Sequence, residues 1–333
     1  MASGDLLKKL FASYRRGDSK EFLIAAQEVI TEEEQRNHHV LARDLQKILE
    51  NGNGRPISSV RRFDLDQLPQ DRERGTTLLE IRTPQRYLDQ LVISPELHDQ
   101  IDVVLGEYRA IQVLQANNLK ARQKLLLAGP PGCGKTLCAE VIASELGLPL
   151  IYTRFDAVIS SYLGETAANL RKVFEYAQRG TWVVFFDEFD AIGKSREDVD
   201  DHGELKRVVN TFLQLLDNFV SDSIFIAATN HERLLDRALW RRFDDILFFD
   251  RPTADQIRNL VDIKLNSVRH QGLNIEHFVD LMVGWSHADV ERVCFEAMKI
   301  GVLIRQTIIT DEIFMLAYER QRRRLEIVQK TTR

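Results

Sequence analysis

The stretch KLLLAGPPGCGKTL, residues 124–137, combines the residue types that bind phosphate. An apolar run leads into a set of small residues and then into a helical pattern; the residues that follow the run are Gly129, Pro130, Pro131, Gly132, Cys133, Gly134, Lys135, Thr136 and Leu137. Their spacing matches the phosphate loop G-x-x-x-x-G-K-T between a strand and a helix. Glycines let backbone N–H groups converge on a β-phosphate, Lys135 reaches the β- and γ-phosphates, and the Thr136 hydroxyl ligates Mg²⁺. A plain Gly-Pro turn is the alternative, and the Lys-Thr pair in register argues against it.

A second apolar run, TWVVFFDEFD at residues 181–190, ends in acids. Val183 to Phe186 are continuous rather than alternating, so we expect a strand in the middle of a sheet, with Asp187 and Glu188 at its carboxyl edge. There Asp187 is predicted to bind the cofactor by holding Mg²⁺ through its water shell. Glu188 is predicted to polarise an attacking water as a general base.

A third apolar run, SIFIAATN, ends in Thr229 and Asn230. An amide at this point can orient the same water and sense the γ-phosphate. We therefore place Asn230 among the catalytic candidates, with a simple turn residue as the alternative.

Alternating helix and strand patterns must position these residues, which predicts an α/β fold with a parallel sheet covered by helices. Four regions are predicted: a helical N-terminal domain over 1–52, a linker over 53–92, the α/β domain over 93–250, and a helical domain over 251–333. The first region reads as three helices, with Ser19 as a cap of the second. The linker contains the strand-like piece TTLLEIRT, and after residue 252 we expect helices only.

Composition narrows the classes of partner. The chain has 333 residues, of which 44% are apolar and 29% charged, and a formal net charge of -5. A globular protein fits these values, and the net charge makes nucleic acid an unlikely partner. Three cysteines form no disulfide framework, and the sequence has neither a secretory segment nor a long apolar run. These features predict a protein of the reducing cytoplasm with no membrane insertion.

The order of the phosphate loop, FFDEFD, IAATN and LLDRALWRRFDD resembles the AAA family of ATPases over residues 93 to about 250. The segment GWSHADVERVCFEAMK resembles the helical lid that follows in that family. The resemblance implies a P-loop fold with helices on both faces of the sheet, ATP and Mg²⁺ as cofactors, and a ring, usually a hexamer, with ATP held between protomers.

The resemblance also assigns a role to RRFDD. Arg241 and Arg242 match the arginine fingers that reach into a neighbour's site and neutralise γ-phosphate charge. The commonest form of the family has RPGRFD, whereas this chain has adjacent arginines, as in the branch of katanin, spastin and the ESCRT-disassembling ATPases. Without the family, a double arginine after a helix indicates a solvated face.

In the lid, this chain has Ser286, His287, Ala288 and Asp289 where the family usually has Ser-Gly-Ala-Asp. The match places Ala288 at the nucleotide, and the bulk of His287 is expected to alter how the lid closes over adenine. Relatives that handle DNA carry an arginine at the place of Ala288, which argues against a clamp loader or a replication initiator.

The stretch SSYLGET, residues 160–166, holds Tyr162, Leu163 and Gly164 among small polar residues. By itself it indicates a turn before a helix, with Tyr162 packed on that helix as a hydrophobic staple. The resemblance places it instead in a loop that points into the ring's channel, where Tyr162 and Leu163 would grip a threaded polypeptide. The charged segment 194–206 is then expected to be a second channel loop, or else a solvated loop.

Together these features predict an ATP-hydrolysing, ring-forming protein remodeller or unfoldase whose N-terminal helical domain binds a protein substrate or partner. Its layout is similar to that of the katanin branch and of compact bacterial AAA ATPases paired with subtilisin-like proteases. Two alternatives stay open. One is a regulatory switch that controls a partner, such as a protease or toxin, without threading, and the other is a nucleic-acid motor.

Overall fold

The computed structural model describes most of the chain from residue 68 onward and one helix before it. The described residues are 19–35, 68–71, 75–154, 163–189, 202–231, 240–266, 269–270, 273–306 and 308–331, with Leu6, Lys9, Ala12, Ser13 and Val158. The chain divides into two compact units, residues 1–67 and 68–333. The domain limits predicted from the sequence are not the same as this division, and they stay predictions.

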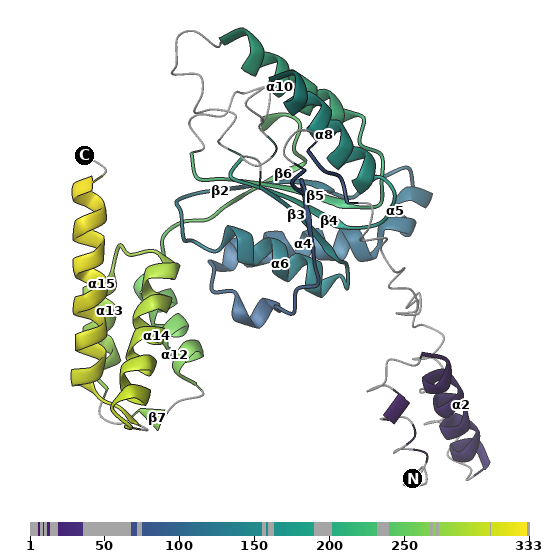
Figure 1. Ribbon diagram of the computed structural model, residues 1–333. Coiled ribbons are helices and arrows are strands. Elements are labelled where there is room, and N and C mark those ends of the chain that lie inside the picture. The colour runs from purple at the N-terminus through teal and green to yellow at the C-terminus, as the bar shows by residue number, and fades with distance from the viewer. Residues whose placement is uncertain are drawn as a thin grey trace. The chain divides into compact units, whose positions relative to one another are not determined.

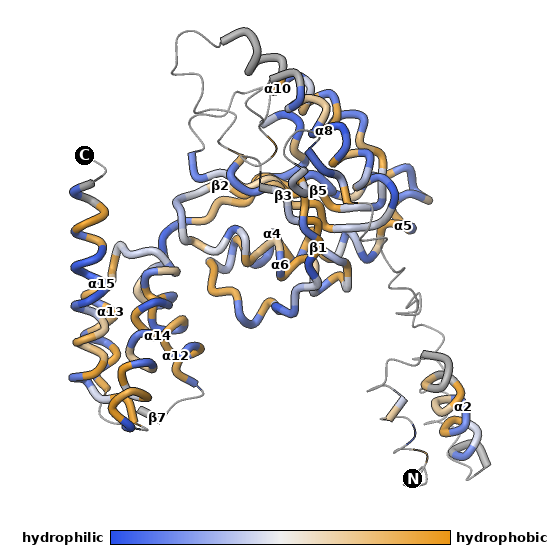
Figure 2. Tube along the Cα trace, in the orientation of Figure 1, coloured by the Kyte–Doolittle hydropathy of each residue, from blue (hydrophilic) through white to orange (hydrophobic). Residues whose placement is uncertain are grey.

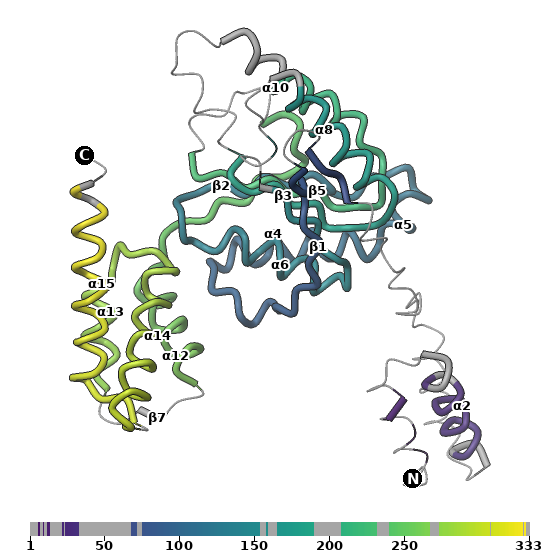
Figure 3. Tube along the Cα trace, in the orientation of Figure 1, coloured from purple at the N-terminus to yellow at the C-terminus, as the bar shows by residue number. Residues whose placement is uncertain are grey.

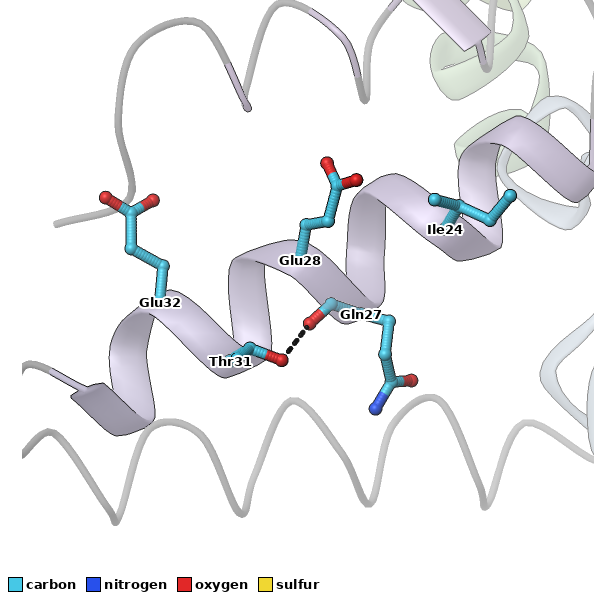
Figure 4. A pocket seen from close by; sticks show the side chains of 5 residues that line it. All are labelled: Ile24, Gln27, Glu28, Thr31 and Glu32. Atoms are coloured by element: carbon cyan, nitrogen blue, oxygen red, sulfur yellow. Dashed lines mark hydrogen bonds between the residues drawn. The ribbon is translucent and has the colours of Figure 1, made fainter.

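The first unit contains helix α2, Ser19–Gln35. Its buried face carries Ala25, Ala26, Val29 and Ile30, while Lys9 Nζ donates to Glu28 Oε2 at 2.8 Å. Figure 4 shows the opposite, more exposed side chains of α2, with the hydrogen bond from Thr31 Oγ1 to the Gln27 carbonyl at 2.9 Å. The third of the predicted N-terminal helices lies outside the described residues.

The second unit is built on a six-stranded sheet with the order β1-β3-β4-β5-β2-β6. All neighbouring pairs are parallel except β1 with β3, which is antiparallel. The α/β prediction is therefore confirmed, with one antiparallel edge strand in addition. The strands are β1 Glu80–Arg82, β2 Lys124–Ala128, β3 Leu150–Arg154, β4 Val183–Asp187, β5 Ile224–Thr229 and β6 Asp245–Phe248.

Helices cover both faces of this sheet, as Figure 1 shows, because the central strands are apolar on both sides. One face packs on α4 and α6, and the other on α8 and α10, while Figure 2 shows the hydrophobic residues gathered between these layers. The helices are α4 Pro95–Arg109, α5 Ile111–Ala116, α6 Lys135–Glu145, α8 Leu163–Ala177 and α10 His202–Asp217.

Aromatic rings fill the face under α8 and α10. Phe174 of α8 stacks on Phe225 of β5 with ring centroids 5.5 Å apart, and Phe212 of α10 lies 5.9 Å from Phe186 of β4. Such pairs add about 0.5–1.5 kcal/mol each beyond the area they bury. This packing fixes β4 and β5, the two strands whose carboxyl ends carry the predicted catalytic residues.

The segment before α4 is attached to the sheet and to α6, although it was predicted as part of the linker. Strand β1 pairs with β3, so that Glu80 faces Tyr152 and Arg82 faces Leu150. Further along, Ser144 Oγ of α6 accepts from the Arg86 N–H at 3.1 Å and donates to the Pro84 carbonyl at 2.9 Å. Residues 80–86 are thus part of the α/β structure and are attached to β3 and α6.

The chain then continues into a group of helices with its own apolar core, which Figure 3 traces as the yellow-green end of the chain. Within it, Phe278 packs on Phe314 at 4.6 Å and Trp285 stacks on Tyr318 at 5.1 Å. The helices are α12 Ala254–Leu265, α13 Ile275–Met282, α14 His287–Leu303 and α15 Asp311–Thr331.

Two sequence expectations need correction. We expected only helices after residue 252, but β7 Arg269–His270 and β8 Ile308–Ile309 form a small parallel sheet. Strands of two residues are too short to leave a periodic signal. The segment 194–206 was expected to be a loop, yet residues 202–206 form the first part of α10; residues 194–201 lie outside the described part.

Within the described ranges no helix is both long and apolar enough to cross a bilayer.

Candidate nucleotide site

The phosphate loop connects β2 to α6, and three of its glycines have positive φ. The values are 141° at Gly129, 74° at Gly132 and 97° at Gly134, a region that other residues rarely occupy. A Cβ on Gly129 would overlap the backbone of Phe249, and a Cβ on Gly132 would lie 2.8 Å from Ser286 Oγ. Glycines are therefore required for the turns of this loop and for its close approach to Phe249 and Ser286. The loop ends at the start of α6, and the first N–H groups of a helix are where anions bind.

Lys135 lies over this loop with a side chain that is almost completely buried. Its Nζ donates to the carbonyl oxygens of Gly129 at 2.7 Å and Pro130 at 2.8 Å. The ammonium group is thus held at the phosphate loop by two carbonyl groups of the loop itself. Cys133 is buried as well, and burial raises the pKa of its thiol, which keeps it protonated and unreactive at neutral pH.

Asp187 ends β4 and receives three hydrogen bonds. Thr136 Oγ1 and the Tyr152 hydroxyl both donate to its Oδ2, at 3.2 and 3.0 Å, and the Glu188 N–H donates to its Oδ1 at 2.9 Å. A hydroxyl and a carboxylate in this contact offer the hard oxygen atoms that Mg²⁺ prefers, so the residues fit that ion. Of these partners, Thr136 was predicted from the sequence and Tyr152 was not.

Glu188 follows with its side chain exposed and a φ of 55°. The next residue returns to the sheet, because the Phe189 N–H donates to the Ala228 carbonyl at 2.8 Å. This single left-handed residue directs Glu188 away from the strand, and a non-glycine residue in such a conformation is a local strain typical of functional sites. Asn230, at the end of neighbouring β5, is partly exposed.

The two arginines lie just before β6. Arg241 is exposed, and Arg242 Nε donates to Asp217 Oδ2, at the end of α10, over 2.9 Å. The acids that follow hold the strands together: Asp244 Oδ2 accepts from the backbone N–H groups of Gln123 and Lys124, both at 2.9 Å. Asp244 therefore has a structural role that the motif RRFDD did not reveal.

The helical part meets the phosphate loop through the start of α14. The Ala288 N–H donates to the Gly132 carbonyl at 3.0 Å. Ser286 and Asp289 form a capping box at this helix start, and Gln321 Nε2 of α15 donates to Asp289 Oδ1 at 2.8 Å. Burial lowers the pKa of the His287 imidazole, and the backbone of Val92 beside it offsets part of that shift.

Two adjacent residues link the cores on either side of the loop. Leu91 packs with Cys133 and α6 in the core of the α/β part, whereas Val92 packs in the core of the helical part. The α/β part, the phosphate loop and the helical part therefore meet at one place.

The family model described as ATPase family associated with various cellular activities (AAA) matches residues 125–251. An uncharacterized AAA family ATPase of Sinorhizobium fredii, y4kL, is 42% identical over 328 residues, covering 97% of each chain. The chain belongs to the AAA family of ATPases. ATP hydrolysis follows from that membership, since the loop, the acids of β4 and the amide of β5 lie in the matched residues.

This AAA ATPase is also similar to larger proteins. It is 32% identical to the ATP-dependent zinc metalloprotease FtsH 2 of Bdellovibrio bacteriovorus over 64% of its own length, and 34% identical to the proteasome-activating nucleotidase of Pyrococcus furiosus over 59%. These matches span 37% and 51% of the relatives' lengths. The matches therefore cover only part of each relative, and by themselves they do not assign the activity of the whole relative to this AAA ATPase.

The structure of this AAA ATPase brings together Lys135, Thr136 and Asp187, with Ala288 at the loop. It places Glu188 and Asn230 at the ends of adjacent strands. Leu163 and Gly164 begin α8, whereas Tyr162 lies outside the described residues.

Proposed function

We propose that this protein is a ring-forming protein remodeller that uses ATP hydrolysis to pull on or disassemble a protein substrate through a central channel. The observation that carries the proposal is the likeness to two relatives whose names tie them to protein breakdown, one a protease and one an activator of the proteasome. The stretch SSYLGET supports it, because an aromatic and an apolar residue stand where the AAA resemblance expects a channel loop.

In the proposed site, Lys135 and the N–H groups of the loop bind the phosphates of ATP. Thr136 and Asp187 would hold Mg²⁺, Thr136 directly and Asp187 through water. That ion would neutralise charge that develops on the phosphates during transfer. The hydrogen bond between the two side chains supports this assignment, since it sets both oxygens at one place.

Glu188 is the proposed general base, which takes a proton from the attacking water. Its side chain is exposed after the strand, so water can reach it. Asn230 is proposed to orient that water, and Arg241 and Arg242 to act on the γ-phosphate of a neighbouring protomer in a hexamer.

The N-terminal unit is proposed to bind a protein partner or substrate. We also place the protein in the cytoplasm, because its three cysteines are free and buried.

The test is the ATPase rate with two kinds of added polymer. A permanently unfolded, alkylated protein is expected to raise the rate, and single-stranded DNA at low salt is expected to leave it unchanged. Stimulation by DNA alone would replace the proposal by a nucleic-acid motor. A rate that neither polymer changes would replace it by a switch that holds a partner without threading.

A further inference from the structure

Tyr152 is joined to the acid that ends β4. Its hydroxyl donates to Asp187 Oδ2 at 3.0 Å, and the same oxygen accepts from Thr136 Oγ1 at 3.2 Å. We propose that Tyr152 is a positioning residue for the Mg²⁺ site, which fixes the Asp187 carboxylate, and that Arg82 holds Tyr152 in place. This inference rests on the proposed function of Thr136 and Asp187 as the residues that hold Mg²⁺.

The register of the sheet explains how Tyr152 reaches its partner. Strands β3 and β4 are parallel, with Tyr152 opposite Phe185 and Arg154 opposite Asp187. Residues two apart on a strand share a face, so Tyr152 and Asp187 lie on the same face, offset along the strands. A tyrosine is long enough to span this offset. Its ring packs beside Phe185 with centroids 5.7 Å apart, and its hydroxyl extends to the carboxylate.

Arg82 then limits the movement of the ring. Its guanidinium carbon lies 3.7 Å from the centroid of the Tyr152 ring. Arg82 Nη2 lies 2.8 Å from Glu80 Oε2, and Arg82 Nη1 lies 3.8 Å from Glu140 Oε1 of α6. The hydrogen bond to Glu80 raises the pKa of Arg82 above its ordinary value, so the cation is permanent. Arg82 of β1 and Phe185 of β4 thus contact the ring, and Glu140 of α6 lies beside Arg82.

The chemical effect is one of orientation. A carboxylate that holds an ion through water must present its lone pairs in fixed directions, and partners outside the metal's own ligands set those directions. The Tyr152 hydroxyl is a neutral donor, so it fixes Asp187 without adding a positive charge that would repel Mg²⁺. Thr136 cannot do this alone, because its own oxygen is proposed to ligate the ion.

Tyr152→Phe tests the proposal, since it removes the hydroxyl and keeps the ring between Arg82 and Phe185. The measurement is the Mg²⁺ concentration at which binding of a non-hydrolysable ATP analogue is half maximal. We expect the variant to need about tenfold more Mg²⁺, the lower end of such effects. Its melting temperature without nucleotide is expected to stay close to that of the unmodified protein.

Tyr108→Phe is the matched control. Its hydroxyl donates to the Asp222 carbonyl at 2.9 Å. Asp222 precedes β5, at the edge of the sheet opposite to the strand ends that carry the phosphate loop and Asp187, so loss of this hydroxyl should leave the Mg²⁺ requirement unchanged. Arg82→Gln is expected to raise the required Mg²⁺ concentration by a smaller factor than Tyr152→Phe does. Arg82→Lys is expected to need a Mg²⁺ concentration close to that of the unmodified protein, since it keeps a cation near the ring.

The outcomes separate this inference from the function on which it rests. If the unmodified protein binds the analogue equally well without Mg²⁺, the proposed metal site is wrong. If it needs Mg²⁺ and Tyr152→Phe needs the same concentration, the positioning role is wrong. A lower melting temperature with an unchanged Mg²⁺ requirement would also overturn the role, because Tyr152 would then be structural only.

Discussion

Arg242 Nε lies 2.9 Å from Asp217 Oδ2, so the arginine proposed to act on a neighbour is paired with an acid of its own chain. Both side chains are partly exposed, and such surface pairs contribute about 0–1 kcal/mol. The pair is therefore weak enough to exchange for a phosphate, whose charge-assisted hydrogen bonds are stronger. The ion pair is therefore compatible with the proposed role of Arg242 in a ring.

The first prediction concerns Arg242 in trans. Protomers with Arg242→Ala and protomers with Lys135→Ala should each have low ATPase activity alone, and a mixture should recover part of it. Recovery is expected where an intact Lys135 meets an intact Arg242. Asp217→Asn is the control, because it breaks the same ion pair and leaves the arginine. If Asp217→Asn loses as much activity as Arg242→Ala, the arginine acts through its own chain and the finger role is wrong.

Glu188→Gln separates hydrolysis from binding. The amide cannot take a proton, so the hydrolysis rate should fall by about 100-fold or more while ATP still binds. Gln has nearly the same size and shape as Glu, so the substitution changes the chemistry of the side chain rather than its volume. Lys135→Ala should instead weaken nucleotide binding itself. Loss of binding in Glu188→Gln, measured by titration with ATP, would contradict the general-base assignment.

Tyr162→Ala separates threading from local packing, although Tyr162 lies outside the described residues. A grip on the substrate predicts nearly unchanged basal ATPase activity and a loss of its stimulation by unfolded protein, with Tyr162→Phe close to the unmodified protein. A staple on α8 predicts instead a loss of roughly 1–3 kcal/mol of unfolding free energy. Thermal unfolding and ATPase assays on the same variant decide between them, and a destabilised variant with proportionate losses excludes threading by Tyr162.

His287 predicts a pH dependence of stability. Burial lowers its pKa below the ordinary value of 6.5, so the unfolded chain binds a proton that the folded protein resists. Its contribution to stability is present above pH 6.5 and is lost as the pH falls through the folded-state pKa. The free energy of unfolding of His287→Asn should therefore depend less steeply on pH below 6.5. His231→Asn, which removes an exposed histidine, is the control; equal slopes in all three proteins would rule out the effect.

The phosphate loop and the acids of β4 were predictable because each motif is contiguous and its neighbours fix its place. A strand, a glycine-rich turn and a helix follow one another from Lys124 to Glu145, and no distant residue is needed to interpret them. Tyr152 could not be found in this way. Its partner Asp187 is 35 residues away, and only the register of β3 with β4 brings the two together.

The pairing of Arg242 with Asp217 was missed for the same reason, since it depends on where α10 ends relative to the start of β6. The strand-like piece TTLLEIRT contains β1, but its antiparallel pairing with β3 at the edge of the sheet could not be derived from so short a piece. By contrast, the approach of Ala288 to the loop was expected from the family resemblance and could not be derived from the spacing of the residues.

The two outer strands of the sheet are short, and each begins with an acidic residue. At one margin β1 offers three residues, including Glu80 and Arg82, and at the other β6 offers four, beginning with Asp245, which is paired with Arg122. A strand from another molecule would find little unpaired backbone there and would have to displace charged side chains. Pairing of sheet edges between two copies of this protein is therefore disfavoured, which leaves side-chain surfaces for any contact between copies.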